Sequence, residues 1–428
     1  MARKLWEKGD RTDDLVERFC TGDDWRWDQR LLEADVEGSR AHARMLARIG
    51  VLKRAELARI ERALTTARSI RVRPDDEDVH TALENFLVAR LGDLGKKIHT
   101  GRSRNDQVLL ATRIWLLREV RAIAEEALSL ADDVARWAEK HRDAAWPGYT
   151  HTRRAMPSSA GHWAAAFAEA LLDDVALLRG AHDLLDQSPL GSAAGYGVSL
   201  PLDRAFVARA LGFARVQGNT LYVQNSRGKF EAHLLAVIEQ VMLTLNRLAA
   251  DVVLLSSEEF GFLTLPKEYC TGSSIMPNKR NPDPLELVRG SLARVRGCRE
   301  AVLSTVANLT SGYHRDLQLT KGPTMEGVDV ARACLGVMRR VFPGIGVDVG
   351  RARRACTPDL YATDEAIRLV RKGMPFRDAY REVASRLDGL AAEDPVANLR
   401  GKRHVGAPGN LGIAGTLRAI ARERRRWK

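Results

Sequence analysis

The sequence feature that most constrains the fold is an apolar repeat in residues 229–255, with spacings of three and four. The pattern consists of Phe230, Leu234, Val237, Ile238, Val241, Leu245, Leu248 and Val252. This spacing predicts a single amphipathic helix, which at its usual rise per residue would be about 40 Å long. Such a length exceeds that of most globular helices and favours a bundle of long helices.

The same periodicity appears in three other stretches, residues 106–137, 157–185 and 285–309. No alternating pattern typical of β-strands runs through the chain, so a mainly α fold is expected. Shorter helices are predicted before the long ones and again after Pro343 and Gly344. We therefore expect three domains: an N-terminal helical domain (1–104), a central long-helix bundle (105–345) and a small C-terminal helical domain (346–428).

The net charge of +12 leaves two kinds of partner open, nucleic acid or a polyanionic small molecule. Most basic residues are interleaved with acidic ones along helical stretches, and only residues 422–428 form a concentrated basic run. A solvated terminus explains that run, so we expect no nucleic-acid partner.

Composition also bears on location and on metal sites. No run of 18 apolar residues occurs and the first residues lack the apolar stretch of a signal peptide, so no membrane partner and a cytoplasmic location are expected. The five cysteines are scattered without a CxxC spacing, which indicates neither zinc nor a disulfide framework.

Residues 272–287, GSSIMPNKRNPDPLEL, carry the strongest chemical signal. They combine adjacent hydroxyls with a cation, an amide and a carboxylate; the candidates are Ser273, Lys279, Asn281 and Glu286. Three prolines prevent a continuous helix through the middle of the segment. A mobile loop that delivers a hydroxyl and a positive charge to an anionic substrate would be built in this way.

Four further polar clusters are spread along the chain. They contain Arg104 and Asn105 in TGRSRNDQ, Thr150 and His151 in GYTHTRRAMP just before a helix expected near Pro157, His80 in the helical EDVHTALE, and Tyr313, Gln318 and Lys321 in YHRDLQLTK. Each alone has an ordinary structural explanation, such as a helix cap, a core histidine or a solvated helix face. Together they suit proton abstraction next to a carboxylate, with cations and helix ends holding the developing charge.

Two other kinds of chemistry receive no support from the chain. The glycines of GSAAGYG, residues 191–197, do not match G-x-G-x-x-G and follow no predicted strand, so we interpret them as a connection between helices. The clusters also lack metal-ligand spacing. Hydride transfer, phosphoryl transfer and a metal cofactor are therefore not expected.

These motifs resemble a known family. The segment GSSIMPNKRNPD is similar to the GSSxMPxKxN loop of the fumarase/aspartase superfamily, and its pairing with HTGRSRNDQV, GYTH, YHRDLQLTKGP and VRKGMPFRDAY resembles the argininosuccinate lyases. The similarity runs from LWEKG near the start to at least Tyr380. It implies a homotetramer in which four central domains form a twenty-helix core and each active site draws on three subunits. It also implies a cofactor-free trans-elimination of argininosuccinate to arginine and fumarate, in arginine biosynthesis.

The resemblance implies a role for each candidate. Ser273 would be the base that removes the Cβ proton, and His151, paired with Glu286, would be on the general-acid side. Lys279 and Asn281 would hold the carboxylate on which charge builds up, and His80 would support the site. The remaining residues would bind substrate: Thr150, Asn105 and Arg104 its carboxylates, and Tyr313, Gln318 and Lys321 its arginine side.

Departures from the family pattern leave alternatives open. Asp24 takes the place of a serine that contacts substrate in the family, Arg153 and Met156 replace glutamines, and LWEKGD replaces LWGGRF. A different N-substituted aspartate could therefore be the substrate. A catalytically inactive structural relative, of the lens-crystallin kind, is a second alternative, against which the retained Ser273, Lys279, His151 and Glu286 argue.

Overall fold

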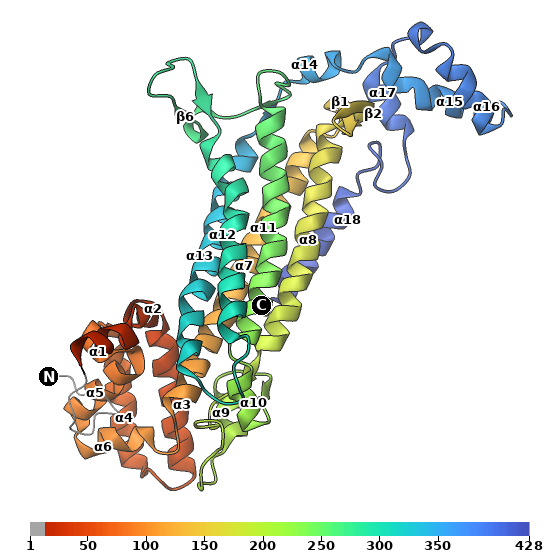
Figure 1. Ribbon diagram of the computed structural model, residues 1–428. Coiled ribbons are helices and arrows are strands. Elements are labelled where there is room, and N and C mark those ends of the chain that lie inside the picture. The colour runs from red at the N-terminus through yellow and green to blue at the C-terminus, as the bar shows by residue number, and fades with distance from the viewer. Residues whose placement is uncertain (1–12, 428) are drawn as a thin grey trace. The chain divides into compact units, whose positions relative to one another are not determined.

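The computed structural model describes residues 13–427, and the expectation of a mainly α fold is confirmed (Figure 1). Five long helices dominate the chain: α7 (Arg104–Lys140), α8 (Ala160–Leu185), α11 (Lys229–Leu255), α12 (Asp283–Val306) and α13 (Lys321–Val341). The LWEKG segment lies outside the described residues. Within residues 13–427, no helix has the length and apolar character needed to cross a membrane.

Shorter helices precede, interrupt and follow the long ones. They are α1 (Asp14–Thr21), α2 (Asp24–Asp28), α3 (Leu32–Arg48), α4 (Arg54–Thr66), α5 (Val79–Leu91), α6 (Asp93–Lys96), α9 (Arg204–Ala210), α10 (Thr220–Asn225), α14 (Val349–Arg354), α15 (Ala362–Arg371), α16 (Phe376–Ala384), α17 (Pro395–Gly401) and α18 (Ile413–Arg426). As expected, the helices shorten after α13, which is followed by a 3₁₀ turn at Phe342–Gly344.

The described residues also form short strands, which the sequence pattern did not reveal. They are β1 (Ala145–Thr150), β2 (Arg153–Ser159), β3 (Gln187–Ser188), β4 (Arg215–Val216), β5 (Leu263–Thr264), β6 (Thr271–Gly272), β7 (Arg280–Asn281) and β8 (Gly346–Val347). They pair as β1–β2, β3–β4, β5–β8 and β6–β7, and only β3–β4 is parallel. Most have two residues, too few for an alternating pattern to be visible.

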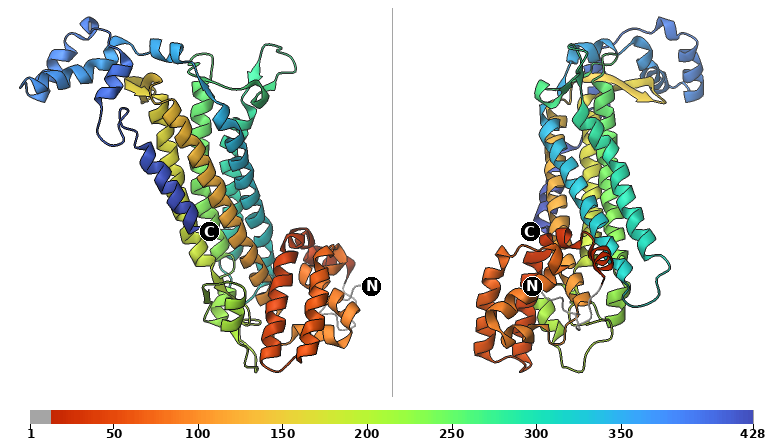
Figure 2. Two further views of the ribbon diagram at one scale, coloured as in Figure 1. Left: turned by 180° about the vertical axis from the view of Figure 1, so that it is seen from behind. Right: turned by 60° about the vertical axis from the view of Figure 1, so that its left-hand side comes forward.

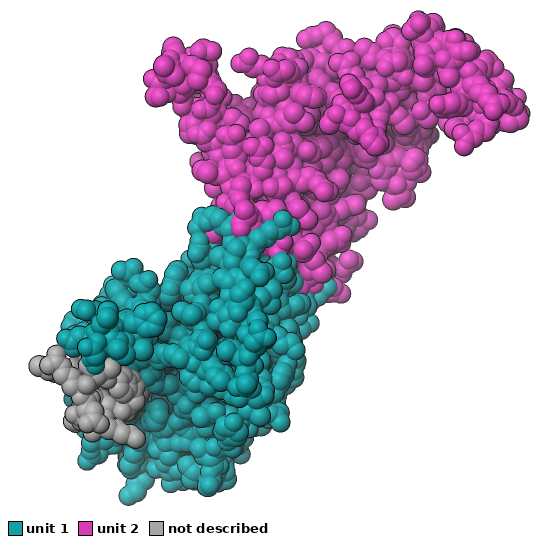
Figure 3. Space-filling view, in the orientation of Figure 1, with its two compact units in different colours: residues 1–122, 178–238, 294–329 teal, residues 123–177, 239–293, 330–428 magenta. Residues whose placement is uncertain are grey.

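The chain divides into two compact units, each made of three stretches (Figure 3). Of the described residues, unit 1 contains 13–122, 178–238 and 294–329, and unit 2 contains 123–177, 239–293 and 330–427. Each unit holds part of all five long helices, and these parts lie side by side within the unit (Figure 2). The division into three consecutive domains stays a prediction.

Helix α11 confirms the periodicity argument. Its bounds are those predicted, and all eight apolar positions of the pattern are buried. Burying each such side chain stabilises the fold by about 1.5–3 kcal/mol relative to leaving it exposed. The side chain of Glu231 accepts a hydrogen bond of 2.7 Å from the backbone N–H of Gly228 and so caps the helix start.

The expected start of a helix near Pro157 is wrong. Residues 153–159 form strand β2, in which Pro157 lies opposite Pro147 of β1, and α8 begins only at Ala160. The hydroxyl of Ser159 accepts from the N–H of His162 at 3.1 Å and provides the helix cap. Proline is tolerated both in the first turn of a helix and in an edge strand, so Pro157 alone does not distinguish the two; its pairing with β1 does.

A cluster of aromatic side chains packs together in unit 2. The rings of Trp137, Trp163 and Phe342 lie with centroids 5.4–6.3 Å apart, and Trp146 adds an edge-on contact of 5.7 Å to Trp163. In the same unit, the basic run near the C-terminus belongs to α18 up to Arg426, and Arg424 pairs with Glu125 of α7 at 3.0 Å. The described part of that run is therefore a helix packed on the bundle.

Candidate active site

The loop that carries Ser273 is the tip of a β-hairpin in unit 2. Strands β6 and β7 pair Thr271 with Asn281 and Gly272 with Arg280, so residues 273–279 form the connection. The loop is exposed to solvent, with Ile275 at 82% of its maximal area, but the side chain of Ser273 is only partly exposed. A loop with so little packing can carry reactive groups without disturbing the core.

The hydroxyl of Ser273 is held by its own loop. Its Oγ accepts hydrogen bonds from the backbone N–H groups of Met276, at 3.1 Å, and Ile275, at 3.3 Å. Hydrogen bonds donated to an oxygen favour its charged form. An alkoxide at Ser273, which a general base would require, would therefore meet two donors already in place.

The other predicted residues of this segment line one cleft of about 720 Å³ within unit 2. Lys279, Asn281 and Glu286 face it, together with Arg351 of α14. Glu286 lies in the first turn of α12, and its carboxylate is 3.8 Å from Arg289. The cleft thus offers cationic and amide groups of the kind that hold a carboxylate.

Thr150 and His151 lie at the turn of the β1–β2 hairpin, also in unit 2. Thr150 pairs with Arg153, which leaves His151 and Thr152 as a two-residue turn. Both turn residues have positive φ, 52° and 58°, in the region that glycine or asparagine usually occupies. Such backbone strain costs about 1–3 kcal/mol per residue and often accompanies functional positions.

Within one chain, Ser273 and His151 lie on different loops. The cleft beside the β1–β2 turn has a volume of about 580 Å³ and is lined by Thr152, Arg153 and Arg351, so Arg351 borders both clefts of unit 2. Among the described residues, no hydrogen bond or ion pair joins His151 to Ser273 or to Glu286. The pairing of His151 with Glu286 stays a prediction.

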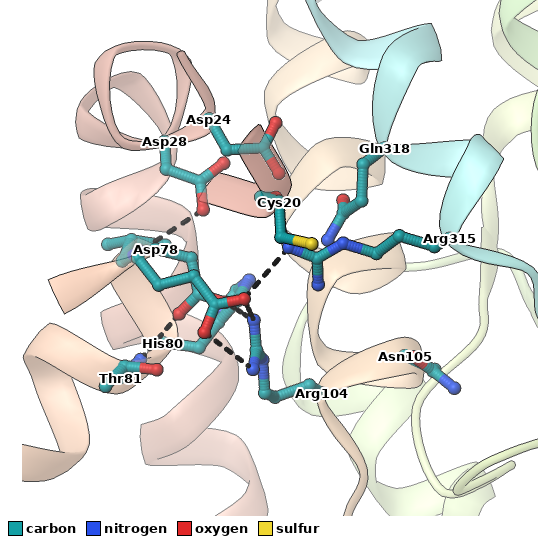
Figure 4. A network of polar contacts seen from close by, with 12 residues as sticks. Cys20, Asp24, Asp28, Asp78, His80, Thr81, Arg104, Asn105, Arg315 and Gln318 are labelled. Carbon is teal, nitrogen blue, oxygen red and sulfur yellow. Dashed lines mark hydrogen bonds and ion pairs between the residues drawn. The ribbon is translucent and has the colours of Figure 1, made fainter. Parts of the chain in front are cut away.

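Unit 1 brings together the predicted residues from distant parts of the sequence (Figure 4). The ammonium group of Lys321, at the start of α13, is buried and forms ion pairs with Asp28 and, at 3.5 Å, with Asp24. Burial lowers the pKa of Lys321, but the two carboxylates outweigh it and raise the pKa overall. Burial raises the pKa of Asp24, and the positive charge of Lys321 lowers it by less, so the pKa of Asp24 is raised overall.

A second ion network surrounds Arg104 (Figure 4). Its guanidinium pairs with Asp78 and, at 3.2 Å, with Glu77, and Glu77 also pairs with Arg315 at 2.9 Å. The side chain of Asn105 lies to one side of this network. Because two carboxylates already engage Arg104, only its remaining donors are open to a substrate carboxylate.

His80 lies in α5, as the sequence predicted, but its side chain is fully buried. Its Nδ1 is 3.0 Å from Asp35 of α3. Burial lowers its pKa, yet the carboxylates of Asp35, Asp78 and Asp28 outweigh this and raise the pKa overall. His80 is thus placed to support the surrounding carboxylates, and its ring has no exposed surface in this structure.

Tyr313 and Gln318 meet at Arg227. The guanidinium of Arg227 donates to Oε1 of Gln318 at 3.0 Å and lies 5.5 Å from the ring centre of Tyr313. Gln318 belongs to a 3₁₀ helix, Arg315–Thr320, whereas Tyr313 precedes it and Lys321 begins α13. Tyr313 and Gln318 thus converge on one arginine although only Gln318 lies in a helical turn.

Sequence reasoning missed several partners of these residues: Asp28, Glu77, Asp78, Arg227 and Arg315. Asp28 could have been found, since Asp24 and Asp28 are four residues apart and share one face of a helix. Glu77 and Asp78 adjoin His80 in the sequence and lie within the motif that was noticed. Nothing in the sequence indicates that Arg227 is buried beside Gln318.

The two groups of side chains suit an elimination reaction. Unit 2 supplies a hydroxyl that accepts from two backbone N–H groups, an exposed histidine and a cleft with a lysine. Unit 1 supplies cations held by buried carboxylates and the amide of Gln318, which accepts from Arg227. Proton abstraction next to a carboxylate needs a base and positive charge for the resulting anion. A lyase is the class of protein that these groups indicate.

Comparison with known proteins agrees with this class. Residues 7–297 match a protein family described as "Lyase". The chain is 49% identical to "Argininosuccinate lyase" of Sorangium cellulosum (strain So ce56), over 99% of this chain and 100% of the relative. It is 48% identical to the protein of the same name from Thermotoga neapolitana, over 90% of this chain and 98% of the relative. The chain belongs to the argininosuccinate lyase family of carbon–nitrogen lyases.

A solved structure supports the fold. The crystal structure of EDDS lyase in complex with formate superposes with a TM-score of 0.79 and 22% identity, and the match covers 98% of this chain and 91% of that one.

Proposed function

We propose that this chain converts L-argininosuccinate to L-arginine and fumarate by a cofactor-free trans-elimination. The identity of 49% to a full-length argininosuccinate lyase supports the substrate, and the hydrogen-bonded hydroxyl of Ser273 carries the chemistry. We expect the reaction to serve arginine biosynthesis in the cytoplasm.

In the proposed reaction, the Ser273 alkoxide takes a proton from Cβ of the succinyl part. The electron pair left behind spreads into the adjacent carboxylate, where Lys279 and Asn281 stabilise the charge. It then forms the carbon–carbon double bond of fumarate as the bond to the guanidino nitrogen breaks. That nitrogen receives a proton from the His151 side, directly or through water, and arginine leaves.

The remaining predicted residues would hold the substrate. Thr150, Asn105 and the free donors of Arg104 would bind carboxylates, and Tyr313, Gln318 and Lys321 would bind the arginine part. His80 has no exposed surface, so we assign it a positioning role through Asp35. Contacts that are equally strong in the bound substrate and in the transition state lower KM. The donors of Lys279 and Asn281, which act on the carboxylate as charge builds on it, would raise kcat.

We further propose a homotetramer in which each active site uses residues from three subunits. The exposed hairpin tip of residues 273–279 and the separate clefts of Lys279 and Thr152 support this proposal. Dilution that dissociates the tetramer should then remove activity. Sedimentation would measure the oligomeric state, and an assay of fumarate release at the same protein concentration would measure the activity. A fully active monomer would overturn the shared site.

The direct test of the substrate is incubation of the purified protein with argininosuccinate while the ultraviolet absorbance of fumarate is followed. Adenylosuccinate and aspartate should give no comparable release. One competing function is a lyase for a different N-substituted aspartate. The Asp24–Lys321 ion pair favours it, because the carboxylate of Asp24 changes the net charge of the pocket proposed to bind the arginine part of the substrate. Faster fumarate release from adenylosuccinate would support that alternative.

A further inference from the structure

Asp106 is a buried carboxylate that none of the proposed chemical steps uses. It lies near the start of α7, directly after Asn105, and has no exposed surface. Its Oδ1 accepts from the N–H of Ser103 at 2.9 Å, which satisfies a backbone donor at the helix start. Its Oδ2 accepts from the N–H groups of Gly191, at 3.0 Å, and Ala193, at 2.8 Å.

The second contact ties α7 to residues 189–197, which we call the glycine loop. The backbone of this loop is irregular, with positive φ at Gly191, Ala193, Gly195 and Gly197. Ala193 is the only one of these four with a side chain, so its φ of 52° is strained. A largely buried loop without regular pairing needs other partners for its backbone groups.

Two charged side chains supply such partners in residues 189–193. The carboxylate of Asp106 accepts from two N–H groups of the loop, and the guanidinium of Arg204, in α9, donates to the carbonyls of Leu190 at 3.0 Å and Pro189 at 3.4 Å. Removing an acceptor from a buried N–H costs about 1–3 kcal/mol for each group left unsatisfied. Asp106 and Arg204 therefore hold residues 189–193 of the loop, while Gly195 and Gly197 donate to the carbonyl of Ser192 within it.

The glycine loop adjoins both substrate-binding segments of unit 1. At one end, Asp106 connects it to the turn that carries Asn105, whose N–H donates to Ser103 Oγ at 3.2 Å. Near the other end of the loop, the side chain of Tyr196 is 78% exposed and its hydroxyl lies beside Gly312. A Cβ atom added to that glycine would be 3.8 Å from the hydroxyl. Gly312 directly precedes Tyr313, a predicted substrate contact.

We propose that Asp106 is a positioning residue whose ionised carboxylate fixes the glycine loop and so sets the geometry of the substrate site between Asn105 and Tyr313. This inference rests on the proposed function of unit 1. Asp106 itself has no exposed surface and acts through its neighbours.

The charges around Asp106 make this contact sensitive to pH. Burial raises the pKa of Asp106 to about 6, against the lowering effect of three backbone N–H donors and Arg102. Two cations interact with Asp106: Arg102 from the turn before α7 and Arg204 from α9. Arg102 in turn interacts with Asp35 and His42 of α3 and with Glu84 of α5. A proton on the carboxyl removes the negative charge that strengthens all three hydrogen bonds, so the hold on the glycine loop weakens below about pH 6.

Hydrogen exchange tests the contact without any substrate. In the wild-type protein, the protection of residues 189–197, corrected for the intrinsic exchange rate, should fall about tenfold between pH 7 and pH 5. In Asp106→Asn it should be low already at pH 7 and independent of pH, because the amide cannot accept from all three groups. Asp93→Asn, an exposed aspartate of unit 1, should behave as wild type. Protection in the wild type that does not change with pH would overturn the proposal, even if the variant fails to fold.

Kinetics test the positioning role. Asp106→Asn should raise KM for argininosuccinate about tenfold, change kcat less than about threefold and remove the acid limb of kcat/KM near pH 6. An unchanged KM together with a loosened loop would refute the role in binding. If the wild type turns over another N-substituted aspartate, KM is measured on that compound. Absence of any turnover by the wild type would reject the proposed function alone, and the exchange measurement would still decide whether Asp106 fixes the loop.

Discussion

The ammonium nitrogen of Lys321 lies 3.5 Å from a carboxylate oxygen of Asp24 in a buried ion pair. Asp28 forms a second ion pair with the same ammonium group. One cation is therefore held by two carboxylates at the place where the resemblance implies binding of the arginine side. The carboxylate of Asp24 competes with any substrate carboxylate for this cation, which a serine at that position would not do.

Asp24→Ser should consequently lower KM for argininosuccinate about three- to tenfold and leave kcat nearly unchanged. The removed carboxylate has a raised pKa because it is buried, so its loss should not destabilise the fold. Steady-state kinetics on the variant and on Asp23→Ser, an exposed neighbour, would measure this. A higher KM would show that Asp24 contributes to binding.

Removing the cation itself should be far more damaging. Lys321→Met would leave Asp24 and Asp28 buried without their partner, at a cost of about 3–5 kcal/mol in the free energy of unfolding. Lys97→Met removes an exposed pair with Glu56 and should cost less than about 1 kcal/mol. Urea unfolding of both variants would test the contrast, and equal losses would contradict it.

Acid should destabilise the protein through His42. Burial and the nearby Arg102 lower the pKa of this histidine to about 3, although its hydrogen bond to the carbonyl of Thr100 opposes the shift. The unfolded chain therefore binds the proton more tightly, and stability is lost as the pH falls from about 6.5 towards 3. The loss approaches about 1.4 kcal/mol per pH unit and reaches roughly 5 kcal/mol at most.

His42→Gln should remove this part of the acid dependence, since its amide can still donate to Thr100 but does not titrate. Thermal unfolding between pH 7 and pH 4 would compare it with wild type and with a change at the exposed His404. Parallel pH curves for wild type and His42→Gln would show that His42 does not bind protons differently in the two states.

The sequence predicts those features of the fold and site that depend on residues close together in the chain. The eight apolar positions of α11 lie within one helix, and their spacing alone predicts its bounds and its buried side. The β1–β2 hairpin escaped notice because its turn, His151–Thr152, lacks the glycine or asparagine that usually marks positive φ. The motif residues themselves were visible because they form short clusters in the sequence.

The partners of those motif residues were the part that could not be predicted. Lys321 and Asp28 are separated by 293 positions, and Arg315 and Glu77 by 238. Only the fold brings such side chains together, and the depth at which Arg227 or His80 is buried follows from packing and not from local pattern. Charge networks of this kind are therefore found in the structure and only afterwards recognised in the sequence.

Lys279 is expected to act on both binding and rate. Lys279→Ala should reduce kcat/KM about 100-fold, because the ammonium group would stabilise the carboxylate more strongly as charge builds on it. The side chain is exposed, so stability should not change. Lys267→Ala, another exposed lysine of unit 2, is the matched control. An unchanged kcat/KM would exclude Lys279 from the site.

The most direct test of the account is fumarate release from argininosuccinate by Ser273→Ala, measured beside Ser274→Ala. If the hydroxyl of Ser273 is the base, its loss should lower kcat by at least about a thousandfold while the fold and assembly remain intact, and Ser274→Ala should cost less than about tenfold. Turnover by Ser273→Ala within tenfold of wild type would contradict the assignment of Ser273 and the mechanism built on it.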